Sequence, residues 1–198
     1  GIRNICPGVL EADDVIHWLC TYYNDHEKVV VSVDQDLAQL VSETTMVFSP
    51  IKNVQITPEN FEDVMKVPVK HFVKYKALMG DKSDNIIGVP RVGAKTAQKI
   101  LSSNDSIKDV LKKDDYFIFE KNLDLVDLSK ALSFHPTEED VYIEQLNELE
   151  SCKVDFDKFK DLCEQYQLNI TLNAIDSWRS VFTKNDFIKR LQSFLNGK

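Results

Sequence analysis

The chain has 198 residues, of which 43% are hydrophobic, and a formal net charge of −8. This length and composition support one large domain, or a domain with a smaller appendage, around a real core. No run approaches the roughly 18 apolar residues of a membrane span, so no membrane association and a cytoplasmic location are expected. The cysteines lack the spacing of a zinc or redox pair and are predicted to be reduced thiols: Cys6, Cys20, Cys152 and Cys163.

The first part of the chain alternates helix and strand. Residues 11–23 place apolar side chains at the three-and-four spacing of an amphipathic helix. The β-branched run at 29–33 predicts a strand buried on both faces of a parallel sheet. A second helix is expected near Asp36, with shorter strands at 44–48 and 54–56 and a helix start at Thr57-Pro58. This alternation predicts an α/β core.

From Val69 the pattern becomes helical and basic. A polar loop at 80–90 separates this helix from another beginning near Ala94, so two helices joined by a long turn are expected. Residues 66–99 hold eight bases and two acids, a net charge of +6, while the rest of the chain carries −14. The basic run is either a solvated helix face or a nucleic-acid-binding patch. Beyond residue 102 the chain is acidic, with helices expected near 106–112, 155–166, 174–182 and 184–195.

Acidic side chains form three clusters along the chain. One pair directly follows the valine-rich strand, at the strand end where open α/β sheets keep their sites. A right-handed crossover could bring the acids of the preceding helix to the same edge, and a third pair lies in the polar loop. The clusters are Glu11, Asp13 and Asp14; Asp34 and Asp36; and Asp81 and Asp84.

Seven carboxylates without histidine or cysteine form a hard oxygen-donor set, which favours Mg²⁺ or Mn²⁺ over zinc. Two such ions about 3.5–4 Å apart are suited to phosphodiester hydrolysis. Each cluster also has an ordinary explanation, because acids favour the first turn of a helix and aspartates are common at strand ends and in loops. Their conjunction around one strand favours the metal site.

The segment from Gly88 to Thr96 joins a tight turn to a helix start. Gly93 would leave backbone N–H groups exposed ahead of the helix, and Lys95 and Lys99 would add charge on one face. The pattern favours a contact with a nucleic-acid backbone, and the alternative is a glycine that serves only packing.

Lys76 stands between the basic helix and the acidic loop, where it could contact the reacting phosphate. Phe72 and Tyr75, which could stack on a base, are instead expected to pack in the core.

Three strings together resemble one family. They are Glu11-Ala-Asp-Asp14; Ser32-Val-Asp-Gln-Asp36 with Gln39-Leu40; and Lys76-Ala-Leu-Met-Gly-Asp-Lys-Ser-Asp-Asn85, which runs into Gly93-Ala-Lys-Thr96. They are similar to the bacterial and bacteriophage 5′ nucleases, which include flap endonucleases, 5′-3′ exonucleases, phage RNase H and the 5′ nuclease domain of DNA polymerase I. The resemblance covers residues 8 to about 132.

The resemblance implies a PIN-like parallel sheet flanked by helices in residues 1–68. It implies a helix-three-turn-helix DNA-binding region in 69–132 and a helical C-terminal region in 133–198. The implied activity is that of a structure-specific 5′ nuclease of DNA replication or repair, acting by two-metal-ion hydrolysis on DNA or RNA:DNA duplexes with a 5′ end or flap. The implied setting is a bacterium or a phage-infected cell.

Site residues follow from the same resemblance. Lys76, Asp34 and Asp36 would be catalytic, all seven acids would hold or support two Mg²⁺ or Mn²⁺ ions, and K⁺ could bind carbonyls of the loop. The implied DNA-binding residues are Lys70, Lys74, Arg91, Gly93, Ala94, Lys95, Thr96 and Lys99.

The sequence departs from the family pattern in three places. Gly8-Val-Leu-Glu11 has one residue more than usual between glycine and glutamate, and Arg91 stands where the hairpin often has glycine. The family's first strand, two earlier metal-binding aspartates and its helical arch would lie upstream of Gly1. An N-terminal partner segment, or a truncated chain, is therefore expected, and the polypeptide alone is expected to hydrolyse DNA poorly.

Two other functions stay open. A non-catalytic DNA-binding subunit, or a fragment of a split nuclease that needs a separate N-terminal segment, would keep the basic helices without assembling both metals. An apolar stripe near the C-terminus could dock on a replication protein such as a single-strand binding protein, or it could pack in a core. The stripe consists of Phe187, Leu191, Phe194 and Leu195.

Overall fold

A computed structural model of the chain describes residues 4–103, 105–150 and 155–183. Its internal contacts divide the chain into two compact units: Cys6–Tyr142 forms one, and Gly1–Ile5 with Ile143–Lys198 forms the other. Among the described residues, no helix is long and apolar enough to cross a membrane. The division of the chain at residues 69 and 133 stays a prediction.

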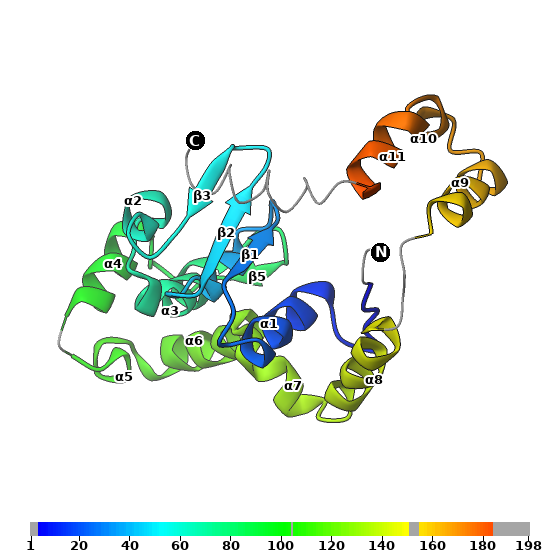
Figure 1. Cartoon of the computed structure of the whole chain (residues 1–198). Helices are drawn as coiled ribbons and strands as arrows, with labels where there is room; N and C mark the ends of the chain where they lie inside the picture. The colour runs from blue at the N-terminus through cyan, green and yellow to red at the C-terminus, as the bar shows by residue number, and fades with distance from the viewer. Residues whose placement is uncertain (1–3, 104, 151–154, 184–198) are drawn as a thin grey trace. The chain divides into compact units, whose positions relative to one another are not determined.

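A three-stranded sheet lies in the first unit (Figure 1). Strand β1 (Lys28–Val31) pairs in parallel with β2 (Thr45–Ser49), and β2 pairs antiparallel with β3 (Val54–Ile56). Helix α1 (Ala12–Tyr22) precedes β1 and buries Val15 and Trp18. The expected alternation of helix and strand is therefore confirmed.

The valine-rich strand was predicted to be buried on both faces, and this prediction is wrong for one of them. Val30 is buried, but Val31 and Val33 are 56% and 55% exposed. Successive side chains of a strand point to opposite faces of the sheet, so Val30 lies on the covered face of β1 and Val31 on the exposed face. The strand has one buried face, not two.

The helix expected to start at Thr57-Pro58 begins later. Helix α2 spans Phe61–Met65. The Asn60 side chain accepts the Thr57 N–H at 2.8 Å and donates to the Gln55 carbonyl at 2.8 Å. This local turn satisfies the backbone groups that a helix start at Thr57 would use, so it competes with the helix.

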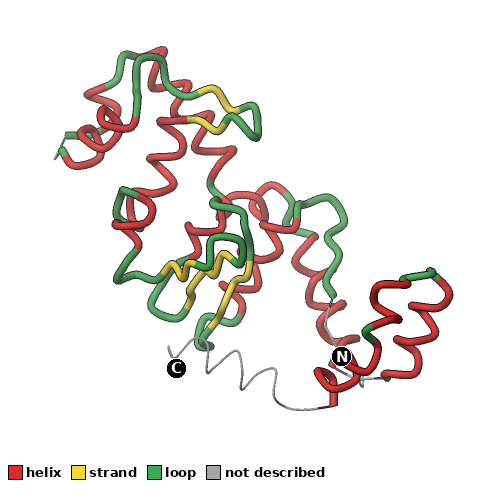
Figure 2. The backbone as a smooth tube through the Cα atoms, turned by 90° about the horizontal axis from the view of Figure 1, so that it is seen from above, coloured by secondary structure: helices red, strands yellow, loops and turns green. Residues whose placement is uncertain are grey.

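Two helices joined by a long turn are confirmed after residue 69. Helix α3 (Val69–Met79) and helix α4 (Ala94–Ser102) are separated by the short antiparallel pair β4 (Gly80–Asp81) and β5 (Ile86–Ile87). Figure 2 shows this pair as strands separate from the three-stranded sheet.

Glycines allow the close approach at the end of α3. Gly80 has a φ of 71°, and a Cβ on it would lie 2.3 Å from the Gly88 nitrogen. Asp81 therefore follows α3 directly through Gly80, a position at which the backbone leaves no room for a side chain.

The remaining helices of the first unit follow α4. Two apolar clusters form the core of this unit: one joins the sheet to η1, α2 and α3, and the other joins α3 to α4 and α6. The helices expected near 106–112, 155–166 and 174–182 are confirmed, whereas α6 and α8 were not individually predicted. The bounds are η1 (Asp36–Leu40, a 3₁₀ helix), α5 (Ile107–Val110), α6 (Lys113–Val126), η2 (Leu128–Lys130, a 3₁₀ helix), α7 (Ala131–Phe134) and α8 (Glu138–Glu150).

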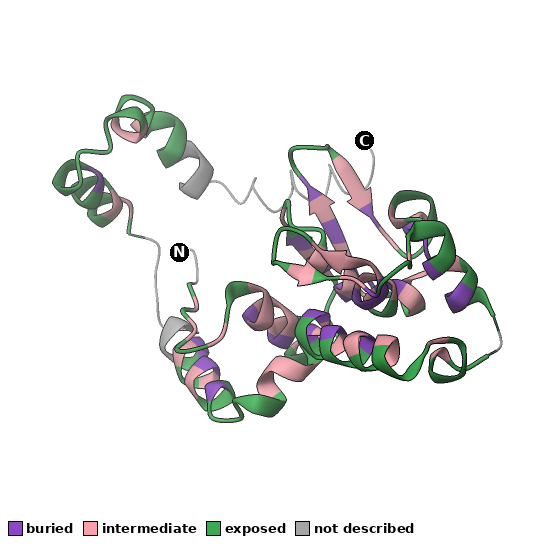
Figure 3. Cartoon of the chain, turned by 180° about the vertical axis from the view of Figure 1, so that it is seen from behind, coloured by how far each residue is buried: buried purple, intermediate pink, exposed green. Residues whose placement is uncertain are grey.

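The second unit contains the C-terminal part of α8 and, after it, three short helices. Cys163 is buried there, and most other described side chains of these helices are exposed or half-buried (Figure 3). The helix expected at 184–195, and with it the stripe from Phe187 to Leu195, lies outside the described residues. The bounds are α9 (Phe156–Gln165), α10 (Asn169–Asn173) and α11 (Ile175–Thr183).

Candidate metal centre and nucleic-acid interface

Three carboxylates from separate elements meet beside the sheet. Asp36 begins η1, Asp81 ends β4, and Asp84 lies in the turn between β4 and β5. One oxygen of each lies within 4.8 Å of the others. The structure therefore brings together the second and third acidic clusters, which are 45 or more residues apart in sequence.

The first acidic cluster reaches the same place. A pocket of about 310 Å³ is bounded by acids on one part of its wall and by apolar residues of β5, α6 and η2 on another. Five of the seven predicted acids line it. The lining residues are Glu11, Asp13, Asp34, Asp36, Asp84, Ile86, Leu125, Val126 and Leu128.

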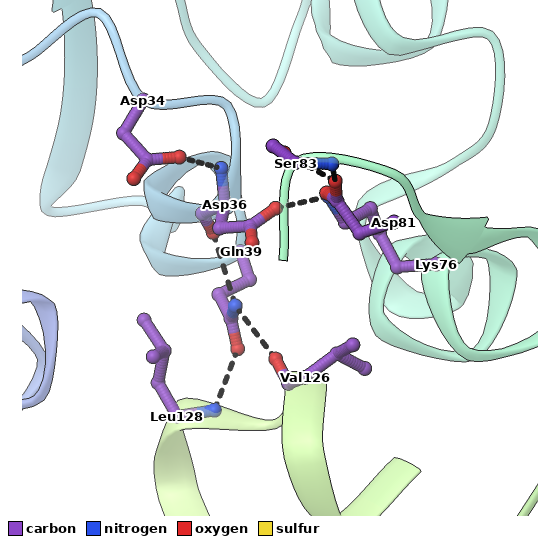
Figure 4. Close-up of polar contacts among 8 residues, drawn as sticks. All are labelled: Asp34, Asp36, Gln39, Lys76, Asp81, Ser83, Val126 and Leu128. Atoms are coloured by element: carbon purple, nitrogen blue, oxygen red, sulfur yellow. Dashed lines mark hydrogen bonds and ion pairs between the residues drawn. The ribbon is translucent and has the colours of Figure 1, made fainter. Parts of the chain in front are cut away.

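The ammonium group of Lys76 forms ion pairs with Asp36 and Asp81 (Figure 4). All three side chains are largely shielded, with 15–17% of each exposed. Burial acts to lower the pKa of Lys76, but its hydrogen bonds to the two carboxylates outweigh this effect and hold the pKa above its ordinary value. Lys76 is therefore a fixed internal cation at the centre of the acids.

The two partners of Lys76 respond differently. Hydrogen bonds from Lys76 and from Ser83 lower the pKa of Asp81 to about 2. Burial raises the pKa of Asp36, and the nearby charges of Asp34 and Asp81 add to the rise, although Lys76 opposes it. The carboxylates are thus close enough to destabilise each other's charge, which is the electrostatic situation that a bound cation relieves.

Local hydrogen bonds hold two of the acids. The Asp36 N–H donates to Oδ1 of Asp34 at 2.9 Å, and the Asp34 N–H donates to the Ser32 hydroxyl at 3.1 Å. The Ser83 N–H donates to Oδ1 of Asp81 at 2.8 Å. Sequence reasoning missed Ser83, for which the only signal is its position two residues after Asp81 in a turn.

The acids at the start of α1 divide into two groups. Burial and the neighbouring Asp14 raise the pKa of Asp13, which lines the pocket. Asp14 accepts the Glu11 N–H at 3.0 Å as part of a capping box. Asp14 is not among the pocket-lining residues, so its role as a metal ligand stays a prediction.

The segment before Glu11 is anchored by α8. The Gly8 N–H donates to Oε2 of Glu138 at 2.9 Å, and a Cβ on Gly8 would lie 2.6 Å from Oε1 of that glutamate. The unusual spacing between Gly8 and Glu11 therefore coincides with a tertiary contact between Gly8 and α8.

The donor set fits a divalent cation. It offers carboxylate oxygens alone from three converging aspartates, and hard cations such as Mg²⁺ and Mn²⁺ prefer oxygen ligands. Three negative charges so close together are unfavourable unless a positive charge lies among them. Lys76 supplies only part of that charge.

Backbone N–H groups are exposed at the start of α4. Gly93 is the N-cap, with no side-chain cap bond, and Gly93 to Thr96 are all exposed. A Cβ built on Gly93 meets nothing within 4 Å, and the residue has a φ of −97°. Internal packing and backbone strain therefore do not explain this glycine, which leaves the amides open to a ligand.

Arg91 adopts a left-handed backbone conformation with a φ of 66°. Its side chain is 75% exposed, and the guanidinium lies 3.8 Å from the Asp115 carboxylate. The hairpin thus keeps the left-handed turn that glycine favours and places an arginine there. The other predicted DNA-binding lysines, Lys70, Lys74, Lys95 and Lys99, are all exposed.

Known proteins resemble this chain in sequence and in fold. Residues 67–163 match the family model described as the 5′-3′ exonuclease C-terminal SAM fold. A 5′-3′ exonuclease of Aquifex aeolicus is 33% identical over 194 residues, which cover 89% of this chain and 64% of that protein. The chain is therefore similar in sequence to bacterial 5′-3′ exonucleases.

Other relatives match shorter parts of this chain. A 5′-3′ exonuclease of Buchnera aphidicola is 38% identical over 114 residues, 56% of this chain and 39% of that protein. DNA polymerase I of Streptococcus pneumoniae is 38% identical over 121 residues, 58% of this chain and 14% of that protein. The chain therefore spans less than two thirds of the curated relatives it matches.

Solved structures show the same fold. One is a bacteriophage T5 flap endonuclease in a pseudo-enzyme-product complex with DNA and metal ions. It aligns with a TM-score of 0.61 at 22% identity, and the alignment covers 72% of this chain and 61% of that chain. A T5 5′-exonuclease with bound zinc ions aligns with a TM-score of 0.60 at 24% identity, covering 71% and 59%. The predicted α/β fold with a helical C-terminal part is confirmed.

Proposed function

We propose that this chain takes part in the divalent-cation-dependent hydrolysis of phosphodiester bonds at the 5′ end or flap of a DNA or RNA:DNA duplex. The observation that carries the proposal is the convergence of Asp36, Asp81 and Asp84, of which the first two form ion pairs with the ammonium group of Lys76. Sequence similarity to bacterial 5′-3′ exonucleases supports the reaction class.

Asp36, Asp81 and Asp84 would hold a Mg²⁺ or Mn²⁺ ion in this proposal. Glu11, Asp13 and Asp34, which line the same pocket, offer oxygen ligands for a second ion, with Asp14 supporting them from α1. Two such ions, when bound, turn a water molecule into a nucleophile and neutralise charge on the leaving oxygen.

In this proposal Lys76 contacts the reacting phosphate. Its charge is held among the acids by Asp36 and Asp81, so it is already positioned when the substrate arrives. A phosphate oxygen can accept a hydrogen bond from an ammonium group, which stabilises charge that develops there during hydrolysis. Asp34 supports the same site by fixing the Asp36 backbone.

The duplex is assigned to the basic helices. The N–H groups of the exposed residues at the start of α4 would donate hydrogen bonds to a phosphate, since the N-terminus of a helix favours anions. These residues are Gly93, Ala94, Lys95 and Thr96. Arg91 and the lysines of α3 and α4 would add phosphate contacts without reading bases. A K⁺ ion on carbonyls of the preceding loop remains part of the proposal.

The test compares cleavage with binding. The chain and its Asp34→Asn/Asp36→Asn variant are assayed on a labelled 5′-flap duplex with Mg²⁺, and binding is measured in EDTA. The variant should lose cleavage and bind the duplex at least as tightly, because two negative charges are removed near the phosphates. Equal and measurable cleavage by both proteins would end the assignment of these aspartates as catalytic, and a non-catalytic DNA-binding subunit would then be the better account of the chain.

A further inference from the structure

The side chain of Gln39 links η1, the helix that carries Asp36, to Val126 and Leu128, which also line the acidic pocket (Figure 4). Its amide nitrogen donates to the carbonyl of Asp36 at 3.0 Å and to the carbonyl of Val126 at 3.2 Å. Its amide oxygen accepts the N–H of Leu128 at 3.1 Å. Both donor hydrogens and one acceptor site of the amide are therefore used.

The partners of Gln39 make these contacts specific to the pocket. Val126 is the last residue of α6 and Leu128 the first of η2, and both line the pocket together with Asp36. They lie 87 and 89 residues after Gln39 in the chain. One half-buried side chain thus links the acid-bearing η1 to the end of α6 and the start of η2.

The helix that carries Asp36 needs such an anchor. η1 is a 3₁₀ helix of five residues with no side-chain cap bond at its N-terminus. Hydrogen bonds in short 3₁₀ segments have poor geometry and give little order of their own. Leu37 and Leu40 pack into the core and hold the apolar face of η1, but they do not touch the carbonyl of Asp36 through a hydrogen bond.

We propose that Gln39 is a positioning residue for the divalent cation, holding Asp36 where it shares an ion with Asp81 and Asp84. The inference rests on the proposed function, since it assumes that these acids bind a cation. Gln39 itself does not touch the ion. It acts through the backbone of Asp36, in the way that groups behind metal ligands set the orientation of the ligands.

The test uses Gln39→Met, which keeps the length of the side chain and removes all three hydrogen bonds. Asn60→Leu is the matched control, because Asn60 also ties two backbone groups, the Thr57 N–H and the Gln55 carbonyl, but lies among β3 and α2 and not among the acids. Thermal unfolding in EDTA gives the stability of each protein. Mn²⁺ titration followed by electron paramagnetic resonance, at a temperature far below every Tm, gives the affinity for the ion.

Both variants should lower Tm, but only Gln39→Met should weaken Mn²⁺ binding, by roughly tenfold or more. A Gln39→Met protein with lowered Tm and unchanged Mn²⁺ affinity would show a purely structural role and overturn the inference while the proposed function stands. Absence of saturable Mn²⁺ binding by the unmodified chain would overturn the cation assignment itself, and the role of Gln39 with it.

Discussion

The ammonium group of Lys76 in α3 forms an ion pair with Asp36 in η1, and both side chains are 17% exposed. The pair joins two elements that are far apart in sequence at the point where the acids meet. It gives the site an internal positive charge before any ion binds. A divalent cation entering the site must therefore share Asp36 with Lys76, which explains why changes at position 76 should affect stability and metal binding in opposite directions.

Lys76→Met should destabilise the metal-free protein and tighten its hold on Mn²⁺. Removing the ammonium group leaves Asp36 and Asp81 shielded and without their ion-pair partner, which should cost about 1–3 kcal/mol of unfolding free energy. The same loss of positive charge removes the competitor of the ion. Urea unfolding in EDTA and Mn²⁺ titration measure the two effects, and a variant that loses Mn²⁺ affinity would contradict this account of the lysine.

Asp81 should shape the acid limb of the stability curve. Its folded pKa of about 2 lies below the ordinary value of 3.8, so Asp81 contributes stability that is present above about pH 4 and is lost as pH falls toward 2. Asp81→Asn should therefore be less stable than the unmodified chain near pH 5, with the difference shrinking between pH 4 and 2. Urea unfolding in EDTA across this range is the measurement, and parallel curves for the two proteins would disprove the assignment.

Arg91→Gly should stabilise the fold and weaken DNA binding. Glycine relieves the left-handed backbone of residue 91, which costs a residue with a Cβ about 1 kcal/mol. The loss of an exposed guanidinium should weaken binding roughly three- to tenfold and reduce the slope of log K against log salt by about 1.

Asn53→Gly is the control for Arg91→Gly. Asn53 also has a positive φ, of 50°, but lies in the turn between β2 and β3. It should not change DNA affinity. Equal DNA binding by the unmodified chain and Arg91→Gly at several salt concentrations would remove Arg91 from the interface.

Gly93 and Gly88 should respond to alanine in different ways. Gly93→Ala meets no neighbour and should cost about 0.5–1 kcal/mol at most through the helix cap, while narrowing access to the α4 amides and weakening duplex binding. Gly88→Ala should cost more than about 2 kcal/mol, because its Cβ would lie 2.2 Å from the Met79 carbonyl oxygen. Thermal unfolding and fluorescence anisotropy with a labelled duplex separate the two, and an unchanged affinity for Gly93→Ala would count against the phosphate site.

Strong local signals made much of the fold predictable. The spacing of apolar residues located α1 and α3, and the β-branched run located β1. Where prediction failed, tertiary or local competition decided. Thr57-Pro58 reads as a helix start, yet Asn60 closes a turn there, and α6 begins after Lys112, which makes no side-chain cap bond that a sequence pattern could reveal.

The residue types of the site were predictable from the sequence, whereas the ion pairs and hydrogen bonds between them were less so. The order of the acids around one strand predicted that they would meet, and five of the seven line one pocket. The pairing of Lys76 with two of them depends on the direct junction of α3 and β4 at Gly80. The contacts of Gln39 depend on residues more than 85 positions away, which no local pattern encodes.

The most direct test of the proposed metal centre is a Mn²⁺ titration, followed by electron paramagnetic resonance, of the unmodified chain and of Asp81→Asn/Asp84→Asn. Asp81 and Asp84 form one cluster with Asp36, so the unmodified chain should bind Mn²⁺ saturably. The double variant should bind at least about tenfold more weakly, because two charged oxygen ligands are replaced by neutral amides. Equal affinity of the two proteins, or no saturable binding by either, would contradict the proposal that these carboxylates act together on one ion.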